Sequence, residues 1–354
     1  LVAVGALGRG APFKECVTHG WTVDGEGKAM HKSLGNGVDP ADVFNENGAD
    51  ILRLWAASAD YHADVRCSKE IFKQLSQNYL KFRNTCKFML DNLVDFDPEN
   101  LVKPEEMPKL DRWLLTKLNE LIEKAEQSYC DYEFHIITHA VNDFCVTTLS
   151  SFYLDIVKDR LYCDGADSLS RRSAQTALYL TLHTLSKLFA PILAFTCDEI
   201  WLAMPHTGED DARNVVLNEM NKPFTAYALT AEEMANWEKL AEVRTVVNGV
   251  LEAARAEKKI GKSLEADVHL TVPAEDAFLA NVDGKELADL LIVSQVEVTV
   301  GDSVKASAEE AAGTKCPRCW KHSTAANAEG LCPRCAEVMR CFPSLLYASP
   351  RPRD

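Results

Sequence analysis

Two Cys-x-x-Cys pairs near the end of the chain constrain its fold more than any other feature. Cys316 and Cys319 form the first pair, Cys332 and Cys335 form the second, and twelve residues separate the pairs. Tetrahedral Zn²⁺ takes four thiolates, and each Cys-x-x-Cys turn delivers two to one side of the metal while an intervening hairpin joins the pairs. A redox pair or two disulfides are the alternatives. We predict one structural Zn²⁺ per chain, held by all four cysteines.

The remaining composition describes an acidic globular protein. The other eight of the twelve cysteines are scattered singly in mostly apolar patterns, which is typical of small buried residues in a reducing cytoplasm. A net charge of -15 argues against general binding of nucleic acid by a positive field. Residues 314–354 nevertheless carry seven Lys or Arg against three acidic residues, so this segment contacts phosphate or is a solvated surface. No apolar run of about 18 residues predicts a membrane span.

Helical periodicity dominates from about residue 65 to residue 225. A helix is expected to begin at Asp111, which is placed to cap it, and its leucines recur at helical spacing. The same periodicity continues over residues 134–159 and 170–204. An antiparallel helix bundle buries such faces, so we predict a bundle here.

The first 64 residues have a mixed pattern. Residues 1–7 are apolar but too few for a signal peptide, so a buried strand is expected there, and residues 16–21 could form another. After a glycine-rich turn and a polar loop, Asp39 is placed as the N-cap of a helix, with Pro40 at its first position.

A third unit is expected from about residue 226. An amphipathic helix follows Thr230, and alternating apolar residues predict strands at 266–272 and 296–300. A linker rich in Ala, Ser and Glu is expected over residues 304–314, before the cysteine pairs.

The loop from Gly27 to Asn36 carries Lys32 and Ser33 between glycines. Such a loop can close over a triphosphate, because an ammonium group stabilises the charge that grows on a pyrophosphate leaving group. The spacing is not that of a Walker P-loop.

Residues 28–36 resemble the K-M-S-K-S loop of class I aminoacyl-tRNA synthetases, which reads R-K-M-S-K-S-L-G-N. Ala29 replaces the first lysine and His31 the first serine. Six positions match the family motif: Met30, Lys32, Ser33, Leu34, Gly35 and Asn36. The resemblance implies that Lys32 is catalytic and that four residues of the loop 29–33 contact ATP with its Mg²⁺: Met30, His31, Lys32 and Ser33.

Downstream segments are similar to the isoleucyl branch of this family. Residues 48–53 and Trp55 resemble the helix that follows the loop in isoleucyl, valyl and leucyl enzymes. Residues 151–162 and 190–201 resemble the anticodon-binding bundle of isoleucyl enzymes. Bacterial isoleucyl enzymes end in a zinc module, whereas valyl enzymes end in a coiled-coil arm. The chain thus resembles the C-terminal part of a bacterial isoleucyl-tRNA synthetase. A valyl enzyme is the nearest alternative. The resemblance covers the whole chain except residues 341–354.

The resemblance implies a mostly α chain with four parts. These are the end of a Rossmann-type catalytic domain (1–64), a helical anticodon-binding domain (65–225), a small α/β domain (226–305) and a zinc-binding module with a tail (306–354). The implied activity is ATP-dependent attachment of isoleucine to its tRNA by a cytoplasmic monomer. The 354 residues contain no H-x-G-H string, so we expect them to be inactive alone. A non-catalytic tRNA-binding zinc protein is the rival reading.

Overall fold

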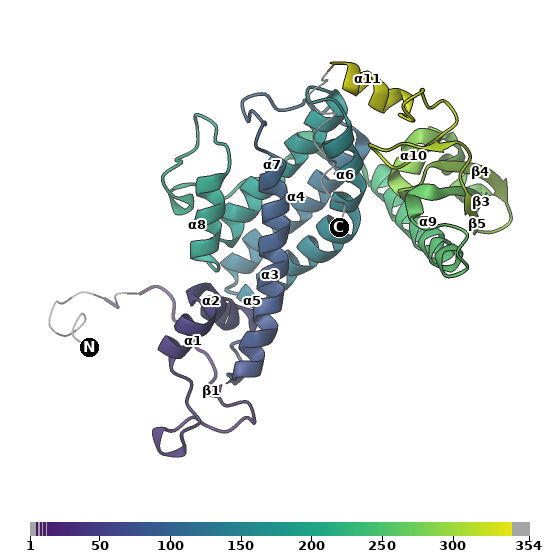
Figure 1. Cartoon of the computed structure of the whole chain (residues 1–354). Coiled ribbons are helices and arrows are strands. Elements are labelled where there is room, and N and C mark those ends of the chain that lie inside the picture. Colours follow the sequence, from purple (N-terminus) through teal and green to yellow (C-terminus); the bar gives the residue numbers. More distant parts are fainter. Residues whose placement is uncertain (1–4, 6–7, 9, 12, 342–354) are drawn as a thin grey trace.

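The computed structural model describes residues 5, 8, 10–11 and 13–341. Figure 1 shows a small N-terminal unit (purple), a long helical bundle, and an α/β unit beside the last helix (yellow) at the far end. This arrangement confirms the mostly α fold class, with the loop and the cysteine pairs at opposite ends. The strand expected over residues 1–7, apart from Gly5, and the tail after Cys341 fall outside the described residues.

The N-terminal unit is a two-stranded parallel sheet with two helices. It contains β1 (Thr22–Val23), β2 (Val65–Arg66), α1 (Pro40–Asn47) and α2 (Ala49–Ser58). The Asp39 side chain accepts a hydrogen bond from the amide of Ala41, which confirms the predicted cap. The strand expected at residues 16–21 is wrong. Pairing starts only at Thr22, because β2 runs alongside the chain only from there.

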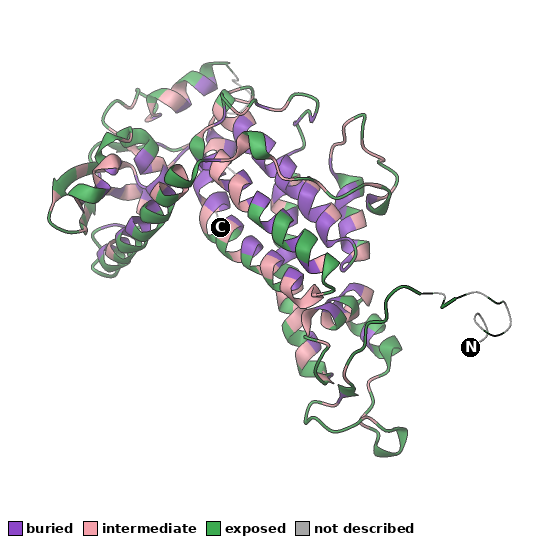
Figure 2. Ribbon diagram, turned by 180° about the vertical axis from the view of Figure 1, so that it is seen from behind, coloured by how far each residue is buried: buried purple, intermediate pink, exposed green. Residues whose placement is uncertain are grey.

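Seven helical segments form the bundle: α3 (Lys69–Asp91), α4 (Lys109–Cys130), α5 (Phe134–Asp143), η3 (Phe144–Tyr153), α6 (Leu154–Cys163), α7 (Leu169–Phe189) and α8 (Ala194–Ala203). The π-helical segment η3 joins α5 to α6 without a break. The segment expected to be helical over 170–204 is two helices, because Pro191 lies between α7 and α8. Figure 2 shows buried residues concentrated along these helices.

Asp111 does not cap a helix, contrary to expectation. Helix α4 begins two residues earlier, after Pro108, and has no side-chain cap. Asp111 is fully buried and accepts a 2.7 Å hydrogen bond from the Tyr153 hydroxyl. Both terminal nitrogens of Arg160 also donate to its carboxylate, at 2.9 and 2.6 Å. A buried carboxylate needs such partners, so this residue connects α4 to α6 instead.

The α/β unit packs helices against one face of a three-stranded sheet. Thr230 and Glu233 form a capping box at the start of α9 (Ala231–Ala256). The sheet order is β4 (Gln295–Gly301), β3 (Ala266–Pro273), β5 (Lys305–Glu310), and α10 (Gly284–Leu291) precedes β4. The linker expected over 304–314 is therefore wrong, since much of it is β5. Its inward residues, Ala306 and Ala308, are too small to give a clear apolar alternation.

A short hairpin and one helix form the cysteine module: β6 (Thr314–Lys315), β7 (His322–Ser323) and α11 (Pro333–Cys341). Five short 3-10 segments also occur in the described part of the chain: η2 (Lys32–Leu34), η4 (Val215–Leu217), η5 (Thr225–Tyr227), η6 (Ser263–Glu265) and η7 (Ala274–Asn281). Segment η2 lies inside the loop that carries Lys32. Among the described residues, every helix is too short or too polar to span a lipid bilayer.

Candidate zinc centre and phosphate loop

The four predicted cysteines converge on one point. One sulfur from each of Cys316, Cys319, Cys332 and Cys335 lies within 4.8 Å of all the others. The sulfurs of Cys319 and Cys332, which come from different pairs, are 3.7 Å apart. A tetrahedral zinc with metal–sulfur distances of about 2.3 Å has sulfur–sulfur edges of about 3.8 Å, so this spacing suits the metal.

The two cysteine pairs lie in different elements of the module. The first pair lies in the turn of the β6–β7 hairpin, where the amide of Trp320 donates to the carbonyl of Cys316 at 2.9 Å. The second pair begins α11, and Cys332 accepts from the amide of Ala336 at 2.9 Å. A hairpin is present as expected, but its two strands enclose the first cysteine pair and do not lie between the two pairs. A loop around Asn327 connects the pairs instead.

The electrostatics of the cluster also fit a cation. Cys316, Cys319 and Cys335 are buried. A hydrogen bond between the first two thiols lowers the pKa of Cys316 and raises the pKa of Cys319. Several thiolates cannot share so small a volume without a positive partner, and zinc supplies that charge to four sulfurs at once. All four positions are protein ligands, which is the pattern of a structural site.

Two arginines bind the cysteine module to the helical bundle, and neither was predicted as a functional residue from the sequence. The Arg318 guanidinium donates to the carbonyls of Tyr162 and Cys163 and lies 3.6 Å from the sulfur of Cys335. Arg334 pairs with Asp159 and, at 3.2 Å, with Asp164. The sequence does contain a feature that points to these arginines, because both cysteine pairs read Cys-Pro-Arg-Cys with arginine at the same position.

The candidate phosphate loop, residues 27–36, lies in the N-terminal unit between β1 and α1. Lys32 begins the short segment η2, which ends at Gly35 with φ 62°. Lys32 and Ser33 are exposed, and the Lys32 ammonium makes no hydrogen bond or ion pair with the described residues. His31 is exposed too, whereas Met30 is half-buried and packs on the small N-terminal core. Lys28, the other nearby cation, pairs with Glu26 at 2.7 Å.

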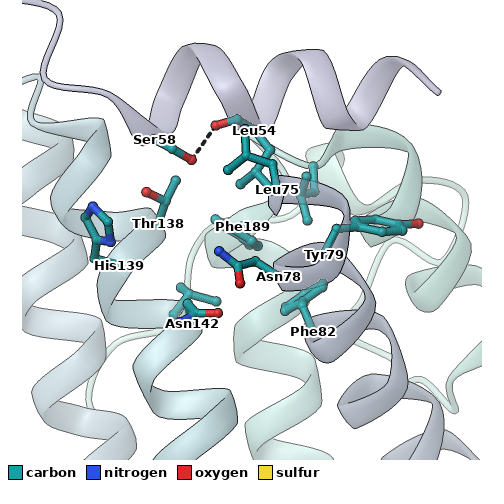
Figure 3. A pocket seen from close by; sticks show the side chains of 12 residues that line it. Leu54, Ser58, Leu75, Asn78, Tyr79, Phe82, Thr138, His139, Asn142 and Phe189 are labelled. Atoms are coloured by element: carbon teal, nitrogen blue, oxygen red, sulfur yellow. Dashed lines mark hydrogen bonds between the residues drawn. The ribbon is translucent and has the colours of Figure 1, made fainter. Parts of the chain in front are cut away.

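A small cavity lies where the N-terminal unit meets the bundle (Figure 3). Ser58 and Leu54 of α2 face Tyr79 of α3 and His139 of α5 across it. Its volume of about 70 Å³ holds a few waters and is far below that of a nucleotide pocket. None of the predicted site residues lines it.

Three family models match separate parts of the chain. Residues 1–68 match tRNA synthetases class I (I, L, M and V), and residues 111–270 match the anticodon-binding domain of tRNA ligase. Residues 313–338 match a zinc finger found in FPG and IleRS, and this segment contains all four cysteines. The match and the buried cluster together support a structural zinc.

Individual relatives match almost the whole chain. Isoleucine–tRNA ligases of Moorella thermoacetica and Caldicellulosiruptor saccharolyticus are each 45% identical to it over 96% of its length. The chain spans about 38% of the length of these relatives. Among solved structures, the ternary complex of Agrobacterium radiobacter K84 LeuRS with tRNA and LeuAMS matches with a TM-score of 0.47 and 16% identity, over 81% of this chain and 32% of that chain. The expected resemblance to isoleucyl enzymes is confirmed.

Proposed function

We propose that this chain is the part of an isoleucine–tRNA ligase that supplies an ATP-contacting loop, the anticodon-binding helices and a structural zinc centre. The observation that carries the proposal is the 45% identity to isoleucine–tRNA ligases along 96% of the chain. The complete enzyme would activate isoleucine with ATP and Mg²⁺ and transfer it to tRNA. The chain would act in the cytoplasm, and the enzyme as a monomer.

The proposed division into parts follows the elements. The catalytic remnant is assigned to residues 1–64, the anticodon-binding domain to 65–225, the small α/β domain to 226–305, and the zinc module with its tail to 306–354. The start of α3 after Ser68 and the capping box at Thr230 lie within a few residues of two of these boundaries. The third boundary cuts through β5, so the sheet supports a limit nearer Glu310.

Lys32 is the proposed catalytic residue of the loop, and Met30, His31 and Ser33 are proposed ATP contacts. An unpaired, exposed ammonium on a loop is available to a phosphate chain. Such a group lowers the barrier when it meets charge that develops in the transition state. Met30 also anchors the loop, because it packs against the small hydrophobic core that contains Val43 and Phe72.

The zinc ligands in this proposal are Cys316, Cys319, Cys332 and Cys335. Zinc would cross-link the β6–β7 hairpin to α11. These elements are too short to bury a core of their own, so metal binding would supply the free energy that folds them.

Basic groups near the zinc module are the proposed tRNA contacts. The cluster lies at the end of α9 and just after it: Arg255, Lys258, Lys259 and Lys262. The Lys262 ammonium lies 4.6 Å from the centre of the Trp320 ring, so the cluster adjoins the cysteine module. Arg255 and Lys259 are paired with acidic neighbours, which leaves a solvated surface as the alternative.

Binding and exchange assays test the proposed function. The 354-residue chain should bind isoleucine tRNA, and its affinity should fall steeply with salt because phosphate contacts release counterions. It should not catalyse isoleucine-dependent exchange of pyrophosphate into ATP, since its sequence has no H-x-G-H string. A chain that binds isoleucine tRNA no better than an unrelated tRNA, or that catalyses exchange alone, contradicts the proposal.

A further inference from the structure

The side chain of Asn36 makes three hydrogen bonds inside the phosphate loop. Its oxygen accepts from the amide of His31 at 2.9 Å. Its nitrogen donates to the Asp24 carboxylate at 2.8 Å and to the carbonyl of Ala29 at 3.1 Å. These partners lie five to twelve residues away, so one amide group ties the end of the loop to its start and its middle.

The Asp24 carboxylate, which accepts from Asn36, also binds backbone amides at the start of the loop. Its second carboxylate oxygen accepts from the amides of Glu26 and Lys28, at 3.0 and 2.8 Å. The hydrogen bond from Asn36 is the largest of the effects that lower the pKa of Asp24, so this carboxylate is ionised near neutral pH. The tight turn that follows is closed by the amide of Gly27, which donates to the Asp24 carbonyl at 3.0 Å.

The loop is also held by an antiparallel bridge between Val23 and Ala29 and by two backbone hydrogen bonds within its 3-10 turn. Its residues are mostly exposed, and Met30 is its contact with a hydrophobic core. The conformation of the segment between Ala29 and Asn36 therefore depends on polar contacts, and most of them pass through Asp24 and Asn36. Lys32 lies inside the span that these contacts close, directly after His31, whose amide Asn36 binds.

We propose that Asp24 and Asn36 are positioning residues, which hold the phosphate loop in the shape that presents Lys32 to the leaving pyrophosphate. The inference rests on the proposed function and adds two residues to it. A flexible lysine must be ordered each time the transition state forms, and that ordering lowers the rate. A loop fixed beforehand avoids this cost, because its geometry is set before the reaction.

The chemistry of the pair explains why an amide faces a carboxylate. Asn36 must accept from a backbone amide while it donates to Asp24 and to a carbonyl, and an amide group does both. A carboxylate at position 36 would keep the acceptor but lose the donor, and it would face the Asp24 carboxylate at hydrogen-bond distance. Asn36→Asp is therefore a nearly isosteric change that breaks the pair.

The test measures adenylate formation by the complete ligase, using isoleucine-dependent pyrophosphate exchange. Asn36→Asp and Asp24→Ala should each lower kcat by roughly tenfold or more, while the KM for ATP changes by less than about threefold. The double exchange Asp24→Asn with Asn36→Asp restores a donor facing an acceptor, so it should recover a large part of the kcat lost in Asn36→Asp. Recovery by the second change would show that the two side chains act as a pair.

Asp42→Asn is the matched control, since it removes a carboxylate from exposed α1 without touching the loop. It should leave both kinetic constants unchanged. Single variants with kcat within twofold of the unmodified enzyme, or a double exchange no better than Asn36→Asp, overturn the inference. An unmodified complete enzyme that shows no exchange contradicts the proposed function itself, so the two failures are distinguishable.

Discussion

Lys32 is exposed and unpaired among the described residues, and this environment determines what its removal should do. Lys32→Ala in the complete enzyme should slow single-turnover adenylate formation by roughly a hundredfold, the scale of one preorganised electrostatic contact. The apparent affinity for ATP should change far less, because the contact forms mainly in the transition state. Ala29→Lys, which restores the charge of the family motif, should be neutral or mildly activating.

Lys69→Ala is the control for this prediction. Lys69 is an exposed lysine whose ammonium pairs with Glu46 at 3.3 Å, and it lies outside the loop. Its removal should leave adenylate formation unchanged. Rapid-quench measurements that find Lys32→Ala as fast as the unmodified enzyme would rule out the assignment of the phosphate loop.

Asp111 is a buried carboxylate inside the bundle, and its charge stabilises the fold. Asp111→Ala would leave the Arg160 guanidinium buried without its carboxylate partner, and Tyr153 without its acceptor. Breaking a buried pair from one side costs about 3–5 kcal/mol of unfolding free energy. Urea denaturation followed by circular dichroism measures this loss. Asp91→Ala, which removes an exposed partner of Lys87, should cost less than about 1 kcal/mol, and equal losses in the two variants would contradict the argument.

At the scale of elements, strong apolar periodicity made the bundle and α9 predictable. Asp39 and Pro40 gave a correct helix start, because caps act through neighbours in sequence. The failures had non-local causes. Asp111 resembles a cap in the sequence because its partners, Tyr153 of η3 and Arg160 of α6, are 42 and 49 residues away. The sequence of strand β5 resembles a linker because its pairing with β3, and not its own small side chains, makes it a strand.

The cysteine module is the element whose fold should depend on metal. Cys332→Ser removes one of four thiolates, so zinc content should fall from one per chain toward zero, and residues 314–341 should lose protection from hydrogen exchange. The helical signal of the bundle should persist, because its core lies in other helices. Cys130→Ser, a change at an exposed cysteine, should keep the zinc. Metal analysis that finds no zinc in the unmodified protein would contradict the site.

At the scale of the whole molecule, the cysteine module joins two larger bodies. Arg318 and Arg334 fix it to the end of α6. On its other side, Lys321 pairs with Asp289 of α10, and Lys315 pairs with Glu265 before β3. The Cys-x-x-Cys spacing predicted the four thiolates because those ligands lie close in sequence. It said nothing of Arg334 and Asp159, which are 175 residues apart.

Arg334→Ala separates docking from metal binding. All four thiolates remain, so zinc content should stay at one per chain. The carboxylates of Asp159 and Asp164 lose their guanidinium, and their side chains are only 10% and 12% exposed. Truncating one partner of such a buried group costs several kcal/mol. Peptides covering residues 159–164 and 314–341 should therefore exchange amide hydrogens several-fold faster.

Arg340→Ala, at an exposed residue 3.8 Å from Glu337, should leave exchange unchanged. If Arg334→Ala kept full protection, the Arg318 hydrogen bonds to α6, the Lys315 and Lys321 ion pairs and the apolar contact with Cys163 would be sufficient to hold the module, and the docking role of Arg334 would be wrong.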